Sequence, residues 1–445
     1  MTAFRPKPSA WARARELAAR TPETRNRYVD FLRAASILVV VCGHWLMAAP
    51  SVDGGAFSLS DMLHVAAWSQ WLTWLFQVMP LFFVVGGYSN AASWEAARRS
   101  GSGYRAWLAA RLQRLVQPIV PLLVVWTGMA VVAHRLGASP EMIRVGSQVA
   151  LIPTWFLAVY VMVVVVAPAM HWLWQRYAMT SFWALVLGAV IVDAVGFAGG
   201  LPAARWANYA FVWLAVHQIG YLWYDGRLAG PARALPWALG GIAVLIFLVT
   251  VAGYPVSMIS VPGEEVSNSR PPSVALLALG AWHAGLVLAL ERTARGWLAR
   301  LRPWTATVLV NATIMTLYLW HATVMVLVVG LAFALGGTGL GTPPGTAAWW
   351  ASRPLWLGFL LAILLVFVAV FGHFEARARG RASSPPAAWQ SVIGAAALCF
   401  GIAALALGGI AGAGFLGVRV SVLVLTFAGA MLAAGVKAPW ARSAR

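Results

Sequence analysis

The chain has 445 residues, of which 61% are hydrophobic and only 10% are charged, and its mean hydropathy is +0.76. A water-soluble domain has about a quarter of its residues charged, so this composition excludes both a soluble globular protein and a disordered one. The net charge of +19 would fit nucleic-acid binding if the protein were soluble, but the composition excludes a soluble protein. The composition therefore predicts an all-α, polytopic membrane protein.

About twelve apolar segments are long enough to be membrane-spanning helices of about 20 residues. In chain order they are 34–49, 66–88, 115–133, 149–168, 182–197, 209–223, 237–254, 274–290, 305–330, 355–371, 392–416 and 420–436. If the N-terminus is cytoplasmic, 26 of the 32 Lys and Arg residues lie on the cytoplasmic side, as the positive-inside rule requires. We therefore predict a multi-pass protein of the cell membrane with both termini cytoplasmic. Its positive charge contacts anionic membrane lipid and not nucleic acid.

Ionisable residues occur in and just before the first of these segments. Arg33 and His44 are separated by close to three helical turns, roughly 16 Å along the axis, so both face the same way. Asp30 lies one turn before Arg33 on that face. A neutral imidazole deep in the membrane is suited to general-base catalysis. The structural alternative is a histidine that only packs against a neighbouring helix.

Two further arginines, Arg111 and Arg114, precede the third apolar segment and share one helical face. Guanidinium groups suit phosphate oxygens, so these residues, with Arg33 and the Arg98–Arg99 pair, predict an anion site at the cytoplasmic surface. Anchoring of the helix ends at the membrane surface is the alternative for these arginines.

The other candidate residues favour no additional chemistry. We predict no metal site, because no metal-ligand spacing occurs among His64, His134, His171, His217, His283 and His373. Cys42 and Cys399 both lie in apolar segments and predict no disulfide framework. The polar loop 264–272 is either an acceptor-binding loop or an ordinary solvated turn.

Five motifs follow one another along the chain. They are Asp30/Arg33/His44, 79–88 (MPLFFVVGGY), 111–118 (RLQRLVQP), 154–160 (TWFLAVY) and 318–321 (YLWH). In this order they resemble the motifs of the acyltransferase 3 family of bacterial membrane proteins. The resemblance covers about residues 26–375.

The resemblance implies an enzyme that moves an acyl group, other than an amino-acyl group, from a cytoplasmic acyl-CoA to a hydroxyl. The default donor is acetyl-CoA, and the implied acceptor is a carbohydrate, a glycolipid or another hydroxyl-bearing molecule outside the cytoplasm. The implied catalytic residues are His44 and His321. The implied acyl-CoA-binding residues are Arg33, Arg111, Arg114, Trp155 and Tyr160. Both direct attack by the acceptor and a covalent relay through His44 remain open.

Two departures from the family pattern limit what can be carried over. Many members have a Glu shortly after the Trp-Phe-Leu element, whereas 157–167 has no acidic residue. The last two predicted spans also lie beyond the usual ten-span core. We therefore predict a basic cytoplasmic segment at 1–25, the acyltransferase core at 26–375, and two additional spans with a cytoplasmic C-terminus at 376–445.

The main alternative function is that of a twelve-span secondary transporter, because many transporters share this topology. Against it, the sequence has no repeated halves of the kind that transporters show, and it has no long central cytoplasmic loop.

Overall fold

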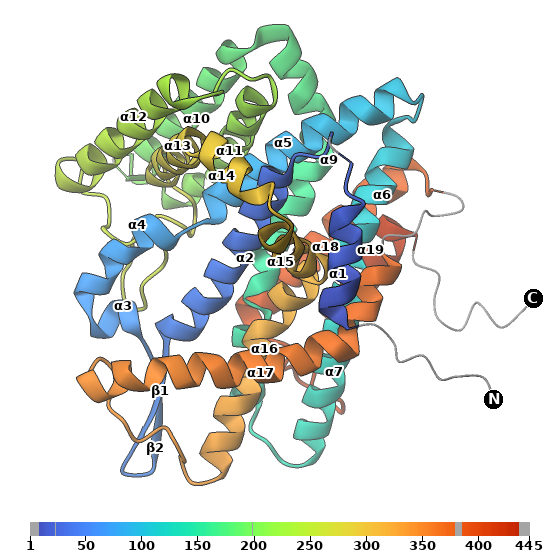
Figure 1. Ribbon diagram of the computed structural model, residues 1–445. Coiled ribbons are helices and arrows are strands. Elements are labelled where there is room, and N and C mark those ends of the chain that lie inside the picture. Colours follow the sequence, from blue (N-terminus) through green and yellow to red (C-terminus); the bar gives the residue numbers. More distant parts are fainter. Residues whose placement is uncertain (1–8, 23, 198, 379–384, 436–445) are drawn as a thin grey trace, which may run out of the picture.

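The computed structural model describes residues 9–22, 24–197, 199–378 and 385–435, which form a bundle of helices with one two-stranded hairpin (Figure 1). The prediction of an all-α, polytopic membrane fold is confirmed. The predictions for both ends of the chain fall partly outside the described residues, at 1–8 and 436–445.

Nine helical segments within the described ranges are long and apolar enough to cross a membrane. They are α2 (Arg27–Met47), η1 to α5 (Ala67–Arg99), α6 to α7 (Tyr104–Arg135), α9 (Pro153–Tyr177), α10 (Met179–Phe197), α12 (Pro231–Thr250), α16 (Ile314–Ala334), α17 (Ala347–Arg377) and α18 (Ala388–Gly408). A tenth span results if α13 (Val274–Ala289) and α14 (Glu291–Leu298), which are bent by 55°, are counted together.

The other two predicted spans correspond to shorter helices. These are α11 (Asn208–Tyr224), with 17 residues, and α19 (Val420–Ala434), with 15 residues. Each predicted segment thus contains a helix. A helix of 17 residues is only about 26 Å long, somewhat less than the hydrocarbon thickness of about 30 Å.

The helices extend well beyond the apolar segments at residues 98–114, which lie between the second and third predicted spans. Here α5 (Met79–Arg99) ends at Arg99 and α6 (Tyr104–Val116) begins at Tyr104. Alanine, arginine and glutamate are good helix formers, so a helix continues where its hydrophobicity ends. Pro118 lies between α6 and α7 (Ile119–Arg135). Proline has no amide hydrogen to donate within a regular helix, which fits its position at this junction.

A β-hairpin follows α2 directly, and the sequence analysis did not predict it. Strand β1 (Ala48–Asp53) pairs antiparallel with β2 (Ala56–Asp61). Gly54 and Gly55, with φ angles of 54° and 85°, form the two-residue turn, and such turns require positive φ at both positions. The short helix α3 (Met62–Val65) follows and is capped by the Asp61 side chain.

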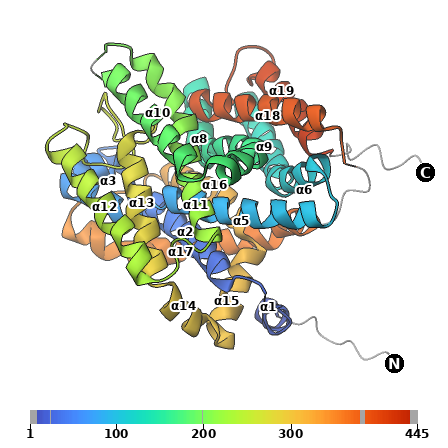
Figure 2. The ribbon, with the colours of Figure 1, turned by 90° about the horizontal axis from the view of Figure 1, so that it is seen from above.

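The remaining elements are short helices. They are α1 (Ala10–Ala19), α4 (Leu72–Phe76), α8 (Pro140–Leu151), η2 (Pro202–Ala207) and α15 (Leu301–Ala312). Helix α1 packs on α15, where the Trp304 indole donates a hydrogen bond to Thr21 at 3.0 Å. From above, α18 and α19 lie beside α9 and α6, and α12 and α13 lie on the opposite side of the bundle (Figure 2).

Close approach of two helices holds α5 against α11. A Cβ atom at Gly87 would lie 1.9 Å from the carbonyl oxygen of His217, and one at Gly220 would lie 2.2 Å from that of Val84. Only glycine permits the two backbones to approach this closely. The pair therefore fixes α5, which lines the site described next.

Candidate active site

Two cavities lie along the helices α2 and α16. The larger, of about 610 Å³, contains residues from the first half of α2 and from the N-terminal end of α16. The smaller, of about 390 Å³, contains residues from the C-terminal ends of α2 and β2. Helix α9 contributes Tyr160 to the larger cavity, and Ile152, just before α9, lines the smaller one. We call them the arginine cavity and the hairpin cavity.

His44 and His321 form a pair between these cavities. The Nδ1 atom of His44 lies 2.8 Å from Nε2 of His321, and the two ring planes are within 11° of parallel. The Nδ1 atom of His321 in turn lies 2.6 Å from the Tyr318 carbonyl oxygen. That oxygen only accepts, so His321 Nδ1 carries the hydrogen and His321 Nε2 is an acceptor.

This assignment determines the tautomer of His44. Its Nδ1–H donates to His321 Nε2, and its own Nε2 therefore carries the lone pair. No hydrogen bond to His44 Nε2 is found among the described residues, and His44 lines the hairpin cavity. The arrangement makes His44 Nε2 a base that is accessible from the hairpin cavity.

The surroundings of His321 hold it in place. The residue is fully buried, and its carbonyl oxygen accepts a hydrogen bond from the Trp45 indole at 3.0 Å. One turn earlier, the Tyr318 hydroxyl donates to the Pro153 carbonyl at 2.7 Å and ties α16 to the start of α9. The imidazole that orients His44 is therefore itself fixed by contacts from α2 and α16.

The arginine cavity concentrates positive charge at the other end of α2. Its lining includes Arg20, Arg25, Arg33, Arg111 and Arg114. Asp30 accepts from Arg25 at 2.6 Å and from Arg33 at 3.4 Å, so Asp30 and Arg33 share a face as predicted.

Serines of α5 hold two of the arginines that come from different helices. Arg33 also donates to the Ser89 hydroxyl at 3.2 Å. Arg111 donates to the Ser89 carbonyl at 2.7 Å and to the Ser93 hydroxyl. Arginine side chains from α2 and α6 are thereby fixed against one segment of α5.

The structure brings together most of the predicted site residues. Tyr160 and the three predicted arginines line the arginine cavity. Trp155 lines neither cavity; its ring lies against Phe156, with centroids 6.3 Å apart. Arg98 and Arg99, at the exposed end of α5, do not line the arginine cavity either, and Arg99 pairs with Glu95 at 3.4 Å.

Glu375 is a buried site residue that the sequence analysis missed. Its carboxylate lines the arginine cavity and accepts from the backbone N–H groups of Met315 at 3.3 Å and Thr316 at 2.9 Å. A carboxylate at a helix N-terminus satisfies free N–H groups and complements the helix dipole. Glu375 therefore fixes the start of α16, the helix that carries His321.

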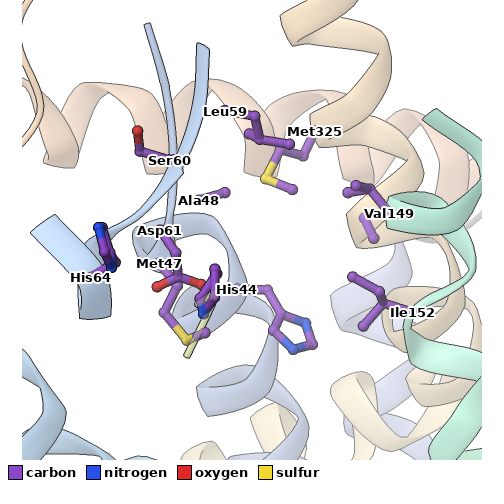
Figure 3. A pocket seen from close by; sticks show the side chains of 12 residues that line it. His44, Met47, Ala48, Leu59, Ser60, Asp61, His64, Val149, Ile152 and Met325 are labelled. Atoms are coloured by element: carbon purple, nitrogen blue, oxygen red, sulfur yellow. The ribbon is translucent and has the colours of Figure 1, made fainter. Parts of the chain in front are cut away.

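The hairpin cavity has both polar and apolar lining. Its polar lining is His44, Ser60, Asp61 and His64, and its apolar lining includes Met47, Leu59, Val149, Ile152, Ala322 and Met325 (Figure 3). Asp61 accepts from the Leu63 backbone N–H at 2.8 Å. Burial raises the pKa of the Asp61 carboxyl, while this hydrogen bond and the nearby His64 act in the opposite direction.

The polar loop 264–272 has an exposed part and a buried part. Glu264 and Glu265 are exposed, but Asn268 is fully buried and donates to the carbonyl oxygens of Pro255 and Ser257. Just before the loop, Pro262 lines the hairpin cavity. No residue of the loop 264–272 itself lines that cavity.

No group of three or more His, Cys, Asp and Glu side chains that could hold a metal ion occurs in the part of the chain that the structure describes. Cys42 is exposed on α2. The buried Cys399 thiol donates to the Ala158 carbonyl at 3.2 Å and ties α18 to α9. Neither cysteine lines either cavity.

One protein family matches most of the chain. A family model described as an acyltransferase domain, that of acyltransferase 3, matches residues 26–374. No curated protein and no solved structure was found to match the chain. The match includes both histidines, Arg33, Arg111 and Arg114, and leaves α1, α18 and α19 outside it. The chain therefore belongs to the acyltransferase 3 family and is a multi-pass membrane acyltransferase.

Proposed function

We propose that the protein transfers an acyl group from acyl-CoA in the arginine cavity to an acceptor hydroxyl in the hairpin cavity. Acetyl-CoA is the default donor, and the acceptor is a carbohydrate or glycolipid outside the cytoplasm. The observation that carries this proposal is the position of the His44–His321 pair between two cavities that both contain residues of α2 and α16.

The arginine cavity fits the chemistry of coenzyme A. Guanidinium groups bind phosphate oxygens through paired, charge-assisted hydrogen bonds, and five arginines line this cavity. Its lining also includes apolar and aromatic residues, among them Ile37, Phe156 and Tyr318. A slender pantetheine arm would follow this lining and bring its thioester towards the histidine pair.

The histidine pair supports direct attack by the acceptor. As the acceptor oxygen attacks the thioester carbonyl carbon, its proton moves to His44 Nε2, and a tetrahedral intermediate forms. Collapse of that intermediate breaks the carbon–sulfur bond, and the departing thiolate takes the proton from His44. During these steps His321 accepts the Nδ1–H of His44 and stabilises the imidazolium, as the orienting member of a catalytic pair does.

The charge distribution supports an orientation of the protein in the membrane. The arginine cavity lies at the end of α2 that follows the basic segment 1–25, and Arg-rich ends face the cytoplasm. Acyl-CoA would then enter from the cytoplasm, and the hairpin cavity would open towards the outside.

The test is transfer of label from radiolabelled acetyl-CoA in membranes that contain the protein. We expect label in a base-labile ester of a saccharide or lipid fraction, and we expect none in membranes with His44→Gln. A transporter would instead move an unmodified solute across sealed vesicles and leave the thioester intact. Absence of any new ester with the wild-type protein, together with solute uptake, would overturn the proposal.

A further inference from the structure

The hairpin cavity contains polar side chains that the proton-transfer step does not use. Asp61 ends β2, and His64 lies within α3. Both line the cavity together with His44. One carboxylate oxygen of Asp61 accepts from the Leu63 N–H. Within the described residues, no hydrogen bond is found to its other oxygen or to the ring nitrogens of His64.

Helix capping does not explain why residue 61 has a charged side chain. The cap of α3 uses one oxygen of Asp61, and Ser, Thr or Asn provides such an oxygen equally well. A charged group in a partly buried cavity loses hydration, and burial raises the pKa of the Asp61 carboxyl accordingly. A hydrogen-bond donor on a bound molecule would replace the lost hydration.

The side chains on the two sides of His44 restrict the shape of a molecule bound in the hairpin cavity. Asp61 and His64 lie on one side of His44, while Val149 and Ile152 lie on the other (Figure 3). A ligand in this space meets hydrogen-bonding groups along one edge and aliphatic side chains across its opposite face. Ligand sites of this composition use a few polar groups to fix orientation.

We propose that the hairpin cavity is an acceptor subsite that selects uncharged polyols and rejects anionic ones. The reacting hydroxyl donates to His44 Nε2, and a second hydroxyl of the same molecule donates to the free oxygen of Asp61. His64 and Ser60 bind further hydroxyl groups at the same edge. Asp61 is a specificity residue here, since it touches the acceptor away from the reacting atoms. The inference rests on the proposed function and deepens it.

The charge of Asp61 is the basis of the selectivity. A carboxylate accepts hydrogen bonds from hydroxyl groups and donates none. An acceptor molecule with its own carboxylate would place two negative charges in a partly buried cavity, where like charges repel strongly. The cavity should therefore distinguish a neutral sugar from its uronate, although the two have nearly the same shape.

The experiment uses these two probes, methyl β-D-glucopyranoside and methyl β-D-glucopyranosiduronate, with the full-length protein in nanodiscs. Transfer from labelled acetyl-CoA gives kcat/KM, and saturation-transfer NMR measures binding of each probe without any reaction. The variant is Asp61→Asn, which keeps the capping oxygen and removes the charge. The control is Asp53→Asn, which removes an exposed charge from the same hairpin.

We expect the wild-type protein and Asp53→Asn to favour the neutral probe, and Asp61→Asn to reduce this preference roughly tenfold, the scale of one charge-assisted hydrogen bond. His64→Ala should weaken binding of both probes without changing the preference. It serves as a second test if Asp61→Asn unfolds. Equal binding of the two probes to the wild-type protein, or an unchanged preference in Asp61→Asn, would overturn the inference.

The binding arm separates this inference from the proposed function. Selective binding of the neutral probe without label transfer would contradict the acyl transfer and leave the polyol subsite intact. Label transfer without charge selectivity would support the acyl transfer and contradict the polyol subsite.

Discussion

Nδ1 of His44 contacts Nε2 of His321 at 2.8 Å, although the two residues are 277 positions apart in the sequence. The contact transmits the hydrogen bond of the Tyr318 carbonyl through His321 to His44. The backbone of α16 thus determines which nitrogen of a side chain on α2 can accept a proton. Changes at either histidine should therefore affect catalysis in different, measurable ways.

Replacement of His44 by Gln should abolish acyl transfer. Glutamine keeps hydrogen-bonding capacity but does not take up a proton near neutral pH, and loss of a general base costs about 10²- to 10⁴-fold in rate. Acetyl-CoA binding should be unchanged, because His44 does not line the arginine cavity and Arg33 lies about three turns away along α2. The measurements are single-turnover label transfer and equilibrium binding.

The matched control for His44 is His373→Gln, which changes an exposed histidine of α17. Its transfer rate should equal that of the wild-type protein. Near-normal turnover of His44→Gln would show that His44 only packs the bundle. Label trapped on His44 in the absence of acceptor would favour the covalent relay.

His321 should behave as a positioning residue. His321→Gln can place an amide oxygen near the former Nε2 and still accept the hydrogen of His44, whereas His321→Leu leaves that hydrogen unpaired. An unpaired buried donor costs about 1–3 kcal/mol, so Leu should reduce kcat roughly 5- to 150-fold, and Gln should restore a large part of it. Equal losses in Gln and Leu would indicate that His321 itself takes up a proton.

Arg111→Ala and Arg114→Ala should weaken acyl-CoA binding more than acceptor binding. Loss of a charge-assisted hydrogen bond costs about 1.5–3 kcal/mol, which corresponds to a roughly ten- to hundredfold rise in the acyl-CoA KM. Arg98→Ala removes the same charge from an exposed position outside the arginine cavity and should leave this KM unchanged. If all three variants behave alike, the arginines only anchor their helices.

Cysteine labelling should place residues 100 and 265 on opposite sides of the membrane. In a Cys42→Ser background, Ser100→Cys should react only from the cytoplasm and Glu265→Cys only from outside, and both positions are exposed. An odd number of spans separates the two positions only if the short helix α11 crosses the membrane. Labelling of both positions from one side would therefore contradict the crossing of α11 and the twelve-span topology.

The sequence predicted the features that depend on residues close together in the chain. Helical periodicity places Asp30 and Arg33 on one face, and the structure shows them in contact. Runs of apolar residues located the membrane helices, but not their ends. The ends of α5 and α6 are polar, and helix formation there depends on backbone propensity and not on hydrophobicity.

Contacts between distant segments could not be predicted in this way. Glu375 is a single acidic residue near the end of a long apolar helix, and only the folded bundle brings it to the start of α16. Trp155 belongs to a recognisable motif, yet its side chain lies outside both cavities. The hairpin was missed because its strands are short, although the Gly54–Gly55 pair is a typical turn signal.

The partition between the two cavities is thin, which matters for the charge balance of the reaction. Ile37 lines one cavity and His44 the other, a separation of about 10 Å along α2, against about 30 Å for a lipid hydrocarbon core. In the proposed reaction the hydroxyl proton crosses this partition to the thiolate, while the acyl group, which leaves its bonding electron pair on the sulfur, crosses the opposite way to the acceptor oxygen. The two transfers compensate each other, because the hydroxyl and the ester are both neutral and the charge of coenzyme A is unchanged. Each turnover would therefore carry no net charge across the partition, and the membrane potential, worth about 2.3 kcal/mol per 100 mV for each charge moved, would neither drive nor oppose acylation.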